Sequence, residues 1–205
     1  MKKDIILCGV GGQGILSIAT IIGQAATQAG IYLKQAEVHG MSQRGGDVQS
    51  HLRLSTEPIW SDLIPMASAD VIISMEPMES LRYLEYLSPE GTVVTGSVPF
   101  VNIPNYPDET ALQSELDALP HVVKNDIEAV AKDCNGARGA NMVLLGMAAL
   151  GDVLFLAVGG QALAELPGFA LLVCCAAISA GSFFRVKAAY NGMKTVPAPQ
   201  GGQKQ

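Results

Sequence analysis

The stretch DIILCGVGGQGILSIATIIGQAATQAG, residues 4–30, decides the fold. Its first apolar run, Asp4 to Cys8, stops at a glycine and predicts a buried strand of a parallel sheet. Isoleucine and alanine then recur at helical spacing, which predicts a helix from Gly12 to Ala29 that ends at Gly30. The chain therefore begins with a strand, a glycine-rich turn and a helix, which is a Rossmann-like start.

The glycine-rich turn, GVGGQG at residues 9–14, has the spacing GxGxxG. Glycine lacks Cβ, so such a turn can bring backbone N–H groups close to a ligand, and the N-terminus of the following helix favours phosphate oxygens. A tight turn that only packs the helix on the sheet is the alternative. The predicted cofactor-binding residues of this turn are Gly9, Gly11, Gly12, Gln13 and Gly14.

A second polar loop, EVHGMSQRGG at residues 37–46, follows the next predicted strand, Ile31 to Val38. Ligands of α/β sheets bind at the carboxyl ends of strands, and an arginine there can grip a carboxylate or phosphate. We therefore predict a loop that binds an anion or a carbonyl group. His39 is the candidate catalytic residue, and the candidate binding residues are Ser42, Gln43, Arg44, Gly45 and Gly46. The alternatives are a hydrogen-bonded loop histidine and a salt bridge of the arginine. Glu37, the only acidic candidate for a dinucleotide ribose, comes a little late.

The middle of the chain alternates between further strands and helices. Residues 47–54 alternate apolar and polar side chains, as an antiparallel or edge strand does, and Ile59 to Trp60 are expected to return as a short hairpin arm. Later strands are predicted at 69–74, 92–95 and 121–123, and helices from Pro77 to Leu87, Asp108 to Leu119 and Asp126 to Cys134. The pattern predicts a three-layer α/β fold with a mainly parallel sheet and a β-hairpin insertion.

The last third of the chain is apolar. Ala140 to Ala164 is predicted to form a core helix followed by a turn at Gly159 and Gly160. Gly168 to Phe184 carries no charge and approaches the lower limit of a membrane span, about 17 residues, but a buried or partner-facing helix is favoured. We expect one domain over residues 1–192 and a flexible tail at 193–205.

Composition excludes several classes of function. The formal net charge is -6, and charged residues make up 16% of the chain, against about 25% in typical domains. Nucleic-acid and membrane partners are therefore not expected, whereas the excess of apolar surface predicts a protein partner. The four cysteines show no CxxC spacing and predict no metal site, only reduced thiols of a cytoplasmic protein. The short apolar run after Met1 is no signal peptide.

The two loops also carry a family resemblance. GVGGQG followed by AEVHGMSQRGGDVQSHLRLS (36–55) resembles the gamma-type subunits of the 2-oxoacid:acceptor oxidoreductases. PMESLRYLEYLSP (77–89) and FVNIPNYPDE (100–109) are most similar to the beta subunit of indolepyruvate:ferredoxin oxidoreductases. The resemblance runs from Lys3 to about Leu150, includes NMVLLG at 141–146, and assigns nothing beyond.

The resemblance implies a reaction in amino-acid catabolism of anaerobes: indolepyruvate or another aryl pyruvate reacts with coenzyme A to give an arylacetyl-CoA, CO2 and reduced ferredoxin. It places thiamine diphosphate, Mg and iron-sulfur clusters on a large partner subunit, through which ferredoxin is reached. This chain would be the small subunit of a heteromer, inactive alone, whose two loops face the partner and help to bind coenzyme A or the oxoacid. His39 would orient the substrate or move a proton.

Two other classes of function stay open. A stand-alone oxidoreductase of Rossmann type would bind NAD or a flavin at the glycine-rich turn. A non-catalytic interaction protein would retain the fold without using either loop for a ligand. Binding of a dinucleotide to the purified chain distinguishes the first of these from the subunit of a larger enzyme, and loop substitutions in a partner complex distinguish the second.

Overall fold

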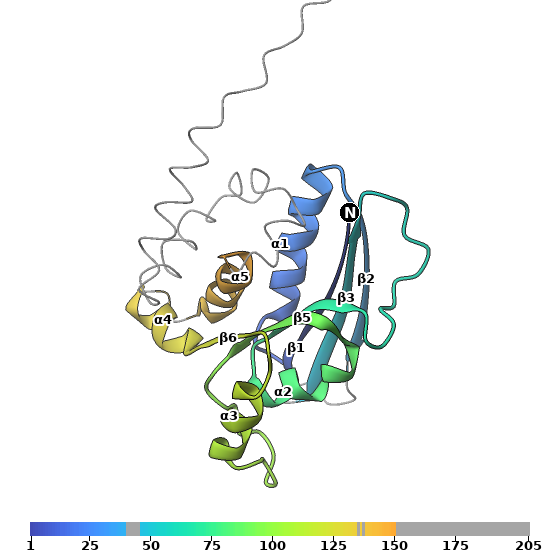
Figure 1. Ribbon diagram of the computed structural model, residues 1–205. Coiled ribbons are helices and arrows are strands. Elements are labelled where there is room, and N and C mark those ends of the chain that lie inside the picture. Colours follow the sequence, from blue (N-terminus) through green and yellow to red (C-terminus); the bar gives the residue numbers. More distant parts are fainter. Residues whose placement is uncertain (40–45, 135, 137, 151–205) are drawn as a thin grey trace, which may run out of the picture.

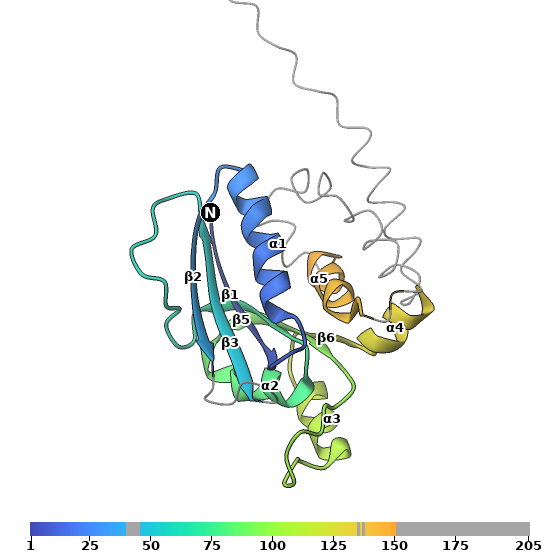
Figure 2. The same ribbon diagram turned by 180° about the vertical axis from the view of Figure 1, so that it is seen from behind.

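A computed structural model describes residues 1–39, 46–134, 136 and 138–150, which form one sheet covered by helices on both faces (Figures 1 and 2). Helices α1, α4 and α5 lie on one face, and α2 and α3 lie toward the other. In chain order the elements are β1 (Lys2–Val10), α1 (Ile15–Gln28), β2 (Tyr32–His39), β3 (Asp47–Ser55), β4 (Ala69–Ser74), α2 (Pro77–Arg82), the 3-10 turn η1 (Leu84–Tyr86), β5 (Leu87–Gly96), α3 (Glu109–Asp117), β6 (Val122–Asn125), α4 (Ile127–Asp133) and α5 (Ala140–Leu150).

The sheet confirms the predicted three-layer α/β class. Its strand order is β2-β3-β1-β4-β5-β6, and β1, β4, β5 and β6 run parallel. β3 is antiparallel to both of its neighbours, β1 and β2. Ile5 to Cys8 of β1 are buried on both sides of the sheet, which explains their unbroken apolar run. The predicted strand at 69–74 has the observed bounds of β4.

The predicted hairpin was placed on the wrong segment. Ile59 and Trp60 lie in a loop, and the antiparallel arm of β3 is β2, with Tyr32 opposite Ser55 and His39 opposite Val48. The physical reason is that β1 and β2 occupy both edges of β3, so its backbone has no edge left for a third strand. Because β3 lies between β1 and β2, the unit β1-α1-β2 is split by an inserted strand.

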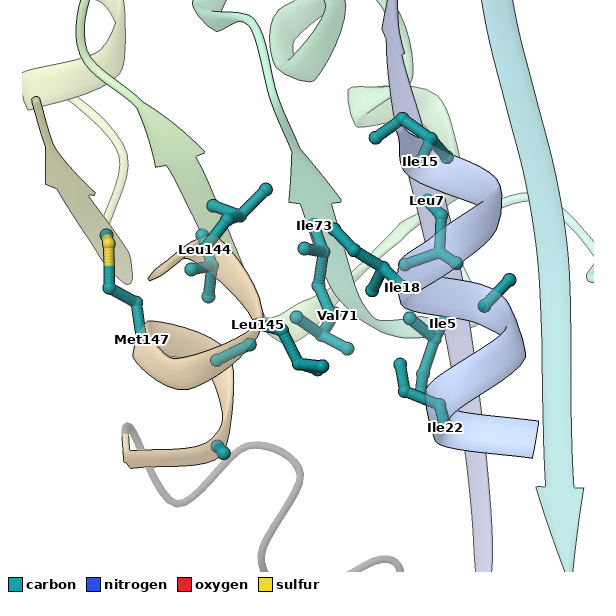
Figure 3. Close-up of a cluster of buried hydrophobic side chains, with 14 of the residues drawn as sticks. Ile5, Leu7, Ile15, Ile18, Ile22, Val71, Ile73, Leu144, Leu145 and Met147 are labelled. Atoms are coloured by element: carbon teal, nitrogen blue, oxygen red, sulfur yellow. The ribbon is translucent and has the colours of Figure 1, made fainter. Parts of the chain in front are cut away.

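The main core lies between the sheet and α1 and α5. The α1 side chains recur every three or four residues and pack on alternate side chains of β1 and β4. Burying each of these large side chains stabilises the fold by about 1.5–3 kcal/mol. Figure 3 shows this cluster, with Ile5, Leu7, Ile15, Ile18, Ile22, Val71, Ile73, Leu144, Leu145 and Met147.

Helix ends follow capping chemistry. Asp108 accepts hydrogen bonds from the backbone of Thr110 and Ala111, and Asp126 accepts one from Ala129, which confirms both predicted caps. The helix predicted from Gly12 begins at Ile15, because Gly14 is its left-handed N-cap. The helix that starts at Pro77 ends at Arg82, earlier than predicted, because Leu87 already belongs to β5.

Several predictions fall outside the described residues. They concern the loop residues Ser42, Gln43, Arg44 and Gly45, the part of the apolar helix beyond Leu150, the turn at Gly159 and Gly160, the segment Gly168 to Phe184, Cys174, Cys175 and the tail at 193–205. Among the helices within residues 1–39, 46–134 and 138–150, none has the length and apolar character needed to cross a bilayer.

Candidate functional site

The glycine-rich turn leaves the carboxyl end of β1 and contacts the start of β3. The N–H of Gly11 donates to the carbonyl oxygen of Gly46 over 2.8 Å, so the turn and the end of the second predicted loop lie together. The side chain of Gln13 closes the turn from inside, because its Oε1 accepts the N–H of Val10 at 2.8 Å. Gln13, which was predicted to contact a ligand, thus stabilises the conformation of the turn through its side chain.

Gly14 connects the turn to α1. Its φ of 85° lies in the left-handed region, and a Cβ there would stand 2.6 Å from Nδ2 of Asn141. No side chain of the described residues caps the N-terminus of α1, so the N–H groups of Ile15 and Leu16 are available to an anion, whereas the N–H of Ser17 donates to the carbonyl oxygen of Gly14 at 3.1 Å. Gly12 is exposed, and a Cβ on it would meet no atom within 4 Å. An anionic ligand can therefore approach the turn at Gly12 and at the start of α1.

The structure brings some of the predicted site residues together and separates others. Gly9, Gly11, Gly12, Gln13 and Gly14 share the turn, and Gly46 joins them through Gly11. His39 is the last residue of β2, and its backbone pairs with Val48 of β3. β3 therefore lies between the histidine and β1. The loop residues from Ser42 to Gly45 lie outside the part of the chain that the structure describes.

Glu37 does not occupy the ribose position of a dinucleotide site. In a Rossmann domain the acidic strand is the neighbour of β1, but here β3 separates them, so β2 lies two strand spacings, about 10 Å, from β1. The carboxylate of Glu37 instead accepts a hydrogen bond from Nε2 of Gln35 at 2.7 Å. The geometry therefore does not fit the standard binding mode of NAD.

A buried carboxylate that the sequence did not reveal lies at the same edge of the sheet. Glu76 is fully buried directly after β4, where it caps α2 by accepting the N–H of Glu79 at 2.9 Å. Its other oxygen accepts the N–H of Phe100 at 3.3 Å and the hydroxyl of Tyr106. Glu76 thus ties the loop between β5 and α3 to the end of β4. A glutamate before a proline indicates the start of a helix, but not that the carboxylate is buried.

Glu79 is a second buried acid, one turn further along α2. Arg82 pairs with it through Nε at 2.8 Å and through a second guanidinium nitrogen at 3.3 Å. Burial raises the pKa of Glu79, and Arg82 opposes that shift. Glu76 and Glu79 are thus both engaged by protein donors and do not form a carboxylate pair that could bind a cation. No cluster of potential metal ligands occurs among the residues that the structure describes.

The thiol nearest to this edge is inert. Cys8 is fully buried, and its Sγ donates to the carbonyl oxygen of Glu79 at 3.6 Å. Burial raises the pKa of Cys8 to about 12. Tyr83 closes the same region, because its hydroxyl donates to Asp47 at 3.2 Å and burial raises its pKa as well. Among the described residues at this edge, backbone N–H groups can bind an anion, whereas the thiol of Cys8 is not an ionised nucleophile.

A shallow cavity of about 290 Å³ lies at the opposite end of β1. Its walls come from the first residues of β1, the last residues of β3 and the loop after β3: Lys2, Asp4, Arg53, Leu54, Ser55, Pro58, Ile59, Trp60 and Ser61. It shares no residue with the glycine-rich turn, so the two sites are separate.

Known structures repeat this fold. The gamma subunit of a keto/oxoacid ferredoxin oxidoreductase from Geobacter sulfurreducens superposes with a TM-score of 0.60 at 22% identity, over 92% of this chain and 98% of that one. A 2-oxoglutarate:ferredoxin oxidoreductase from Magnetococcus marinus, solved with 2-oxoglutarate, coenzyme A and succinyl-CoA bound, gives 0.59 at 18% identity. The match covers 100% of this chain but only 33% of that one, so the fold spans about a third of the longer protein.

Sequence relatives are more similar. Indolepyruvate oxidoreductase subunit IorB of Thermococcus kodakarensis is 37% identical over 180 residues, which cover 83% of this chain and 81% of the relative. The subunit of the same name from Archaeoglobus fulgidus is 36% identical over 155 residues, 72% of this chain and 76% of the relative. A sequence model of the family described as pyruvate ferredoxin/flavodoxin oxidoreductase matches residues 4–165. The chain belongs to this family of 2-oxoacid oxidoreductases, as its two loop motifs predict.

Proposed function

We propose that this chain is the small subunit of an indolepyruvate:ferredoxin oxidoreductase. In this role it completes the active site of a large thiamine diphosphate subunit that converts an aryl pyruvate and coenzyme A into an arylacetyl-CoA. The identity to IorB subunits over most of both chains supports the substrate class. The single observation that carries the site is the hydrogen bond from Gly11 to Gly46, because it joins the glycine-rich turn to the last residue of the second predicted loop.

The chain contributes binding and shielding in this proposal. When bound to the partner, thiamine diphosphate supplies the stabilisation of the carbanion. The N–H groups of Gly12, Gly14 and the first two residues of α1 hold an anionic group of coenzyme A or the oxoacid, because the N–H of Gly11 is already engaged by Gly46. Arg44 neutralises the same negative charge, and His39 orients the oxoacid or moves a proton. Glu76 keeps the neighbouring loop in place through Phe100 and Tyr106.

Reconstitution with the large subunit from the same organism tests this function. The complex should reduce ferredoxin with indolepyruvate and coenzyme A, and the small subunit alone should not. Arg44→Ala should raise the KM for coenzyme A or for the oxoacid by 10-fold or more, as about 1.4 kcal/mol of lost binding predicts. Lys132→Ala, on the exposed surface of α4, is the matched control and should change neither KM. Unchanged KM values and kcat in Arg44→Ala would contradict the assignment.

Competition between substrates tests the aryl preference separately. A KorC subunit of 2-oxoglutarate synthase from Methanothermobacter marburgensis is 32% identical over 95 residues, less than half of this chain. We therefore expect kcat/KM to be higher for indolepyruvate and phenylpyruvate than for pyruvate or 2-oxoglutarate. The reverse order would assign the complex to another 2-oxoacid.

The two other classes of function are distinguished by direct binding. Titration of the purified chain with NADH or FAD should show no saturable binding, because the inserted strand β3 moves Glu37 away from β1. Saturable dinucleotide binding would favour the stand-alone oxidoreductase. A complex that keeps full activity with Gly12→Val and Arg44→Ala would favour the non-catalytic interaction protein.

A further inference from the structure

The loop at residues 56–68, between β3 and β4, exposes three large apolar side chains. The exposed fractions are 92% for Trp60, 54% for Leu63 and 63% for Met66. Figures 1 and 2 show this loop on the side of the sheet away from α1, α4 and α5, and Ile64 of the loop packs on that face with Ile6 of β1 and Ile72 of β4. A tryptophan so exposed is unusual on a free surface and frequent at the centre of protein interfaces.

The loop is held rigidly from beneath, although it has no regular secondary structure. Arg53 donates to the carbonyl oxygens of Ser61 and Leu63 at 3.1 and 2.9 Å. The same guanidinium is fixed by Asp4, 1% exposed, through hydrogen bonds of 2.8 and 3.1 Å. Nδ1 of His51 accepts the N–H of Ile64 at 3.0 Å. The apolar side chains are therefore presented in a fixed conformation, which lowers the entropy lost on binding.

The surroundings of Trp60 also have the form of an interface. The cavity beside it, about 290 Å³, is open to a side chain from another protein. Tyr32 of β2, 52% exposed, pairs in the sheet with Ser55, which lines the cavity, and extends the surface to the sheet edge. This surface therefore combines an exposed side chain, Trp60, that can insert into a partner with a cavity that can accept a partner's side chain.

The charges around the patch indicate what binds there. Glu57 and Asp62 are exposed beside Trp60, and both are acidic. Nearby cations do not balance both acids, because Lys2 is paired with Asp4 at 2.8 Å, and Lys34 is one further exposed cation, on the same face of β2 as Tyr32. In a symmetric dimer the patch would face itself, which would bring these acids close to each other. An unlike partner with basic residues around an apolar pocket fits the patch better.

We propose that residues 56–68 form a docking surface for the large subunit of the oxidoreductase, with Trp60 as its anchor. The inference rests on the proposed function, because that function supplies the partner. The surface lies at the amino end of β1, whereas the glycine-rich turn lies at the carboxyl end. The large subunit thus contacts both ends of β1, and contacts at the docking surface contribute affinity apart from the ligand site.

Binding measurements between the full-length chain and the purified large subunit test the docking surface. Trp60→Ala should raise the Kd by at least about 30-fold, the effect of losing an interface anchor. Asp62→Lys should weaken binding at low salt, with a difference that shrinks as salt is added. Val123→Thr, on β6 at the other edge of the sheet, is the matched control and should leave the Kd unchanged. Circular dichroism of each variant checks that the fold is intact.

Three outcomes would overturn the docking surface, and they are distinguishable. If the wild-type chain does not bind the large subunit, the proposed function fails and the docking surface fails with it. If the wild-type chain binds and Trp60→Ala binds equally well, the docking surface alone is wrong. If Trp60→Ala instead dissociates a homodimer and leaves the Kd for the large subunit unchanged, a second copy of this chain is the occupant.

Discussion

Asn141 donates a hydrogen bond from Nδ2 to the carbonyl oxygen of Gly14 over 3.2 Å, which joins the start of α5 to the start of α1. Met142 donates to Oδ1 of the same side chain at 2.9 Å, so Asn141 also bonds to the backbone in the first turn of its own helix. The two helices that cover the main core therefore meet at the glycine-rich turn. A change on either side of this contact should move the turn.

Gly14→Ala should destabilise the fold by about 2 kcal/mol, because a non-glycine residue in the left-handed region costs about 1–2 kcal/mol and the new Cβ meets Asn141. Urea unfolding measures the loss. In an Asn141→Ala background the same substitution should cost less, since the clash is gone. Gly30→Ala is the matched control, with a φ of 68° and no atom within 4 Å of the added Cβ. Equal costs of Gly14→Ala in both backgrounds would show that the contact has no part in the effect.

Tyr106→Phe should destabilise the fold by about 1 kcal/mol, because it removes one hydrogen-bond donor from the buried carboxylate of Glu76. Glu76→Gln should cost more, since the amide nitrogen then faces a donor where an oxygen stood. Faster amide exchange at Phe100 would locate both effects in the loop before α3. Tyr32→Phe, which is exposed, should change the free energy of unfolding by less than about 0.5 kcal/mol. A loss in Tyr32→Phe as large as that in Tyr106→Phe would contradict this account.

His51 should make stability fall in mild acid. Burial and the neighbouring Arg53 lower its pKa, so near pH 6 the unfolded chain binds more protons than the folded chain. Its contribution is present above the unfolded pKa of about 6.5 and is lost as the pH falls through the lower folded value. His51→Asn, whose carbonyl oxygen can accept the N–H of Ile64, should flatten the change in unfolding free energy between pH 7.5 and 5.5. His121→Asn, at an exposed position, should leave that slope unchanged.

Asp4→Asn should destabilise the fold by about 3–5 kcal/mol, because it leaves the guanidinium of Arg53 buried without its counter-charge. Proteolysis within residues 56–68 should become faster, since Arg53 also holds that loop. The pair of Lys124 with the exposed Asp117 is the matched control, and Asp117→Asn should cost less than about 1 kcal/mol. Similar losses in both variants would show that burial adds nothing to the Asp4 pair.

Local patterns predicted much of this fold, and long-range contacts account for what they missed. β4 and the caps Asp108 and Asp126 were predictable because an apolar run and a capping side chain act within a few residues. The alternation in β3 indicated one solvent-exposed face, yet His51 and Arg53 on that face are buried, because the loop after the strand covers them. The contact of the loop with His51 and Arg53 is visible only in the folded chain.

In the candidate site, too, the local feature was predictable and the long-range one was not. The glycine-rich turn is a local motif and was predictable from its spacing. The burial of Glu76 depends on Phe100 and Tyr106, which lie 24 and 30 positions further along the chain. A single sequence gives no sign that a glutamate will meet partners at such distances, so the buried acid was missed.

The position of β3 between β1 and β2 sets the order in which the sheet can assemble. The segment β1-α1-β2 is complete once His39 has been synthesised, but its two strands have no edge in common. A nascent chain that ends before Asp47 therefore has no backbone ladder to form between them. We expect the β2-β3 hairpin to close first, because few residues separate its strands, and β1 to add afterwards to the free edge of β3. Ribosome-bound chains should gain protection of β1 amides only after Ser55 has left the exit tunnel.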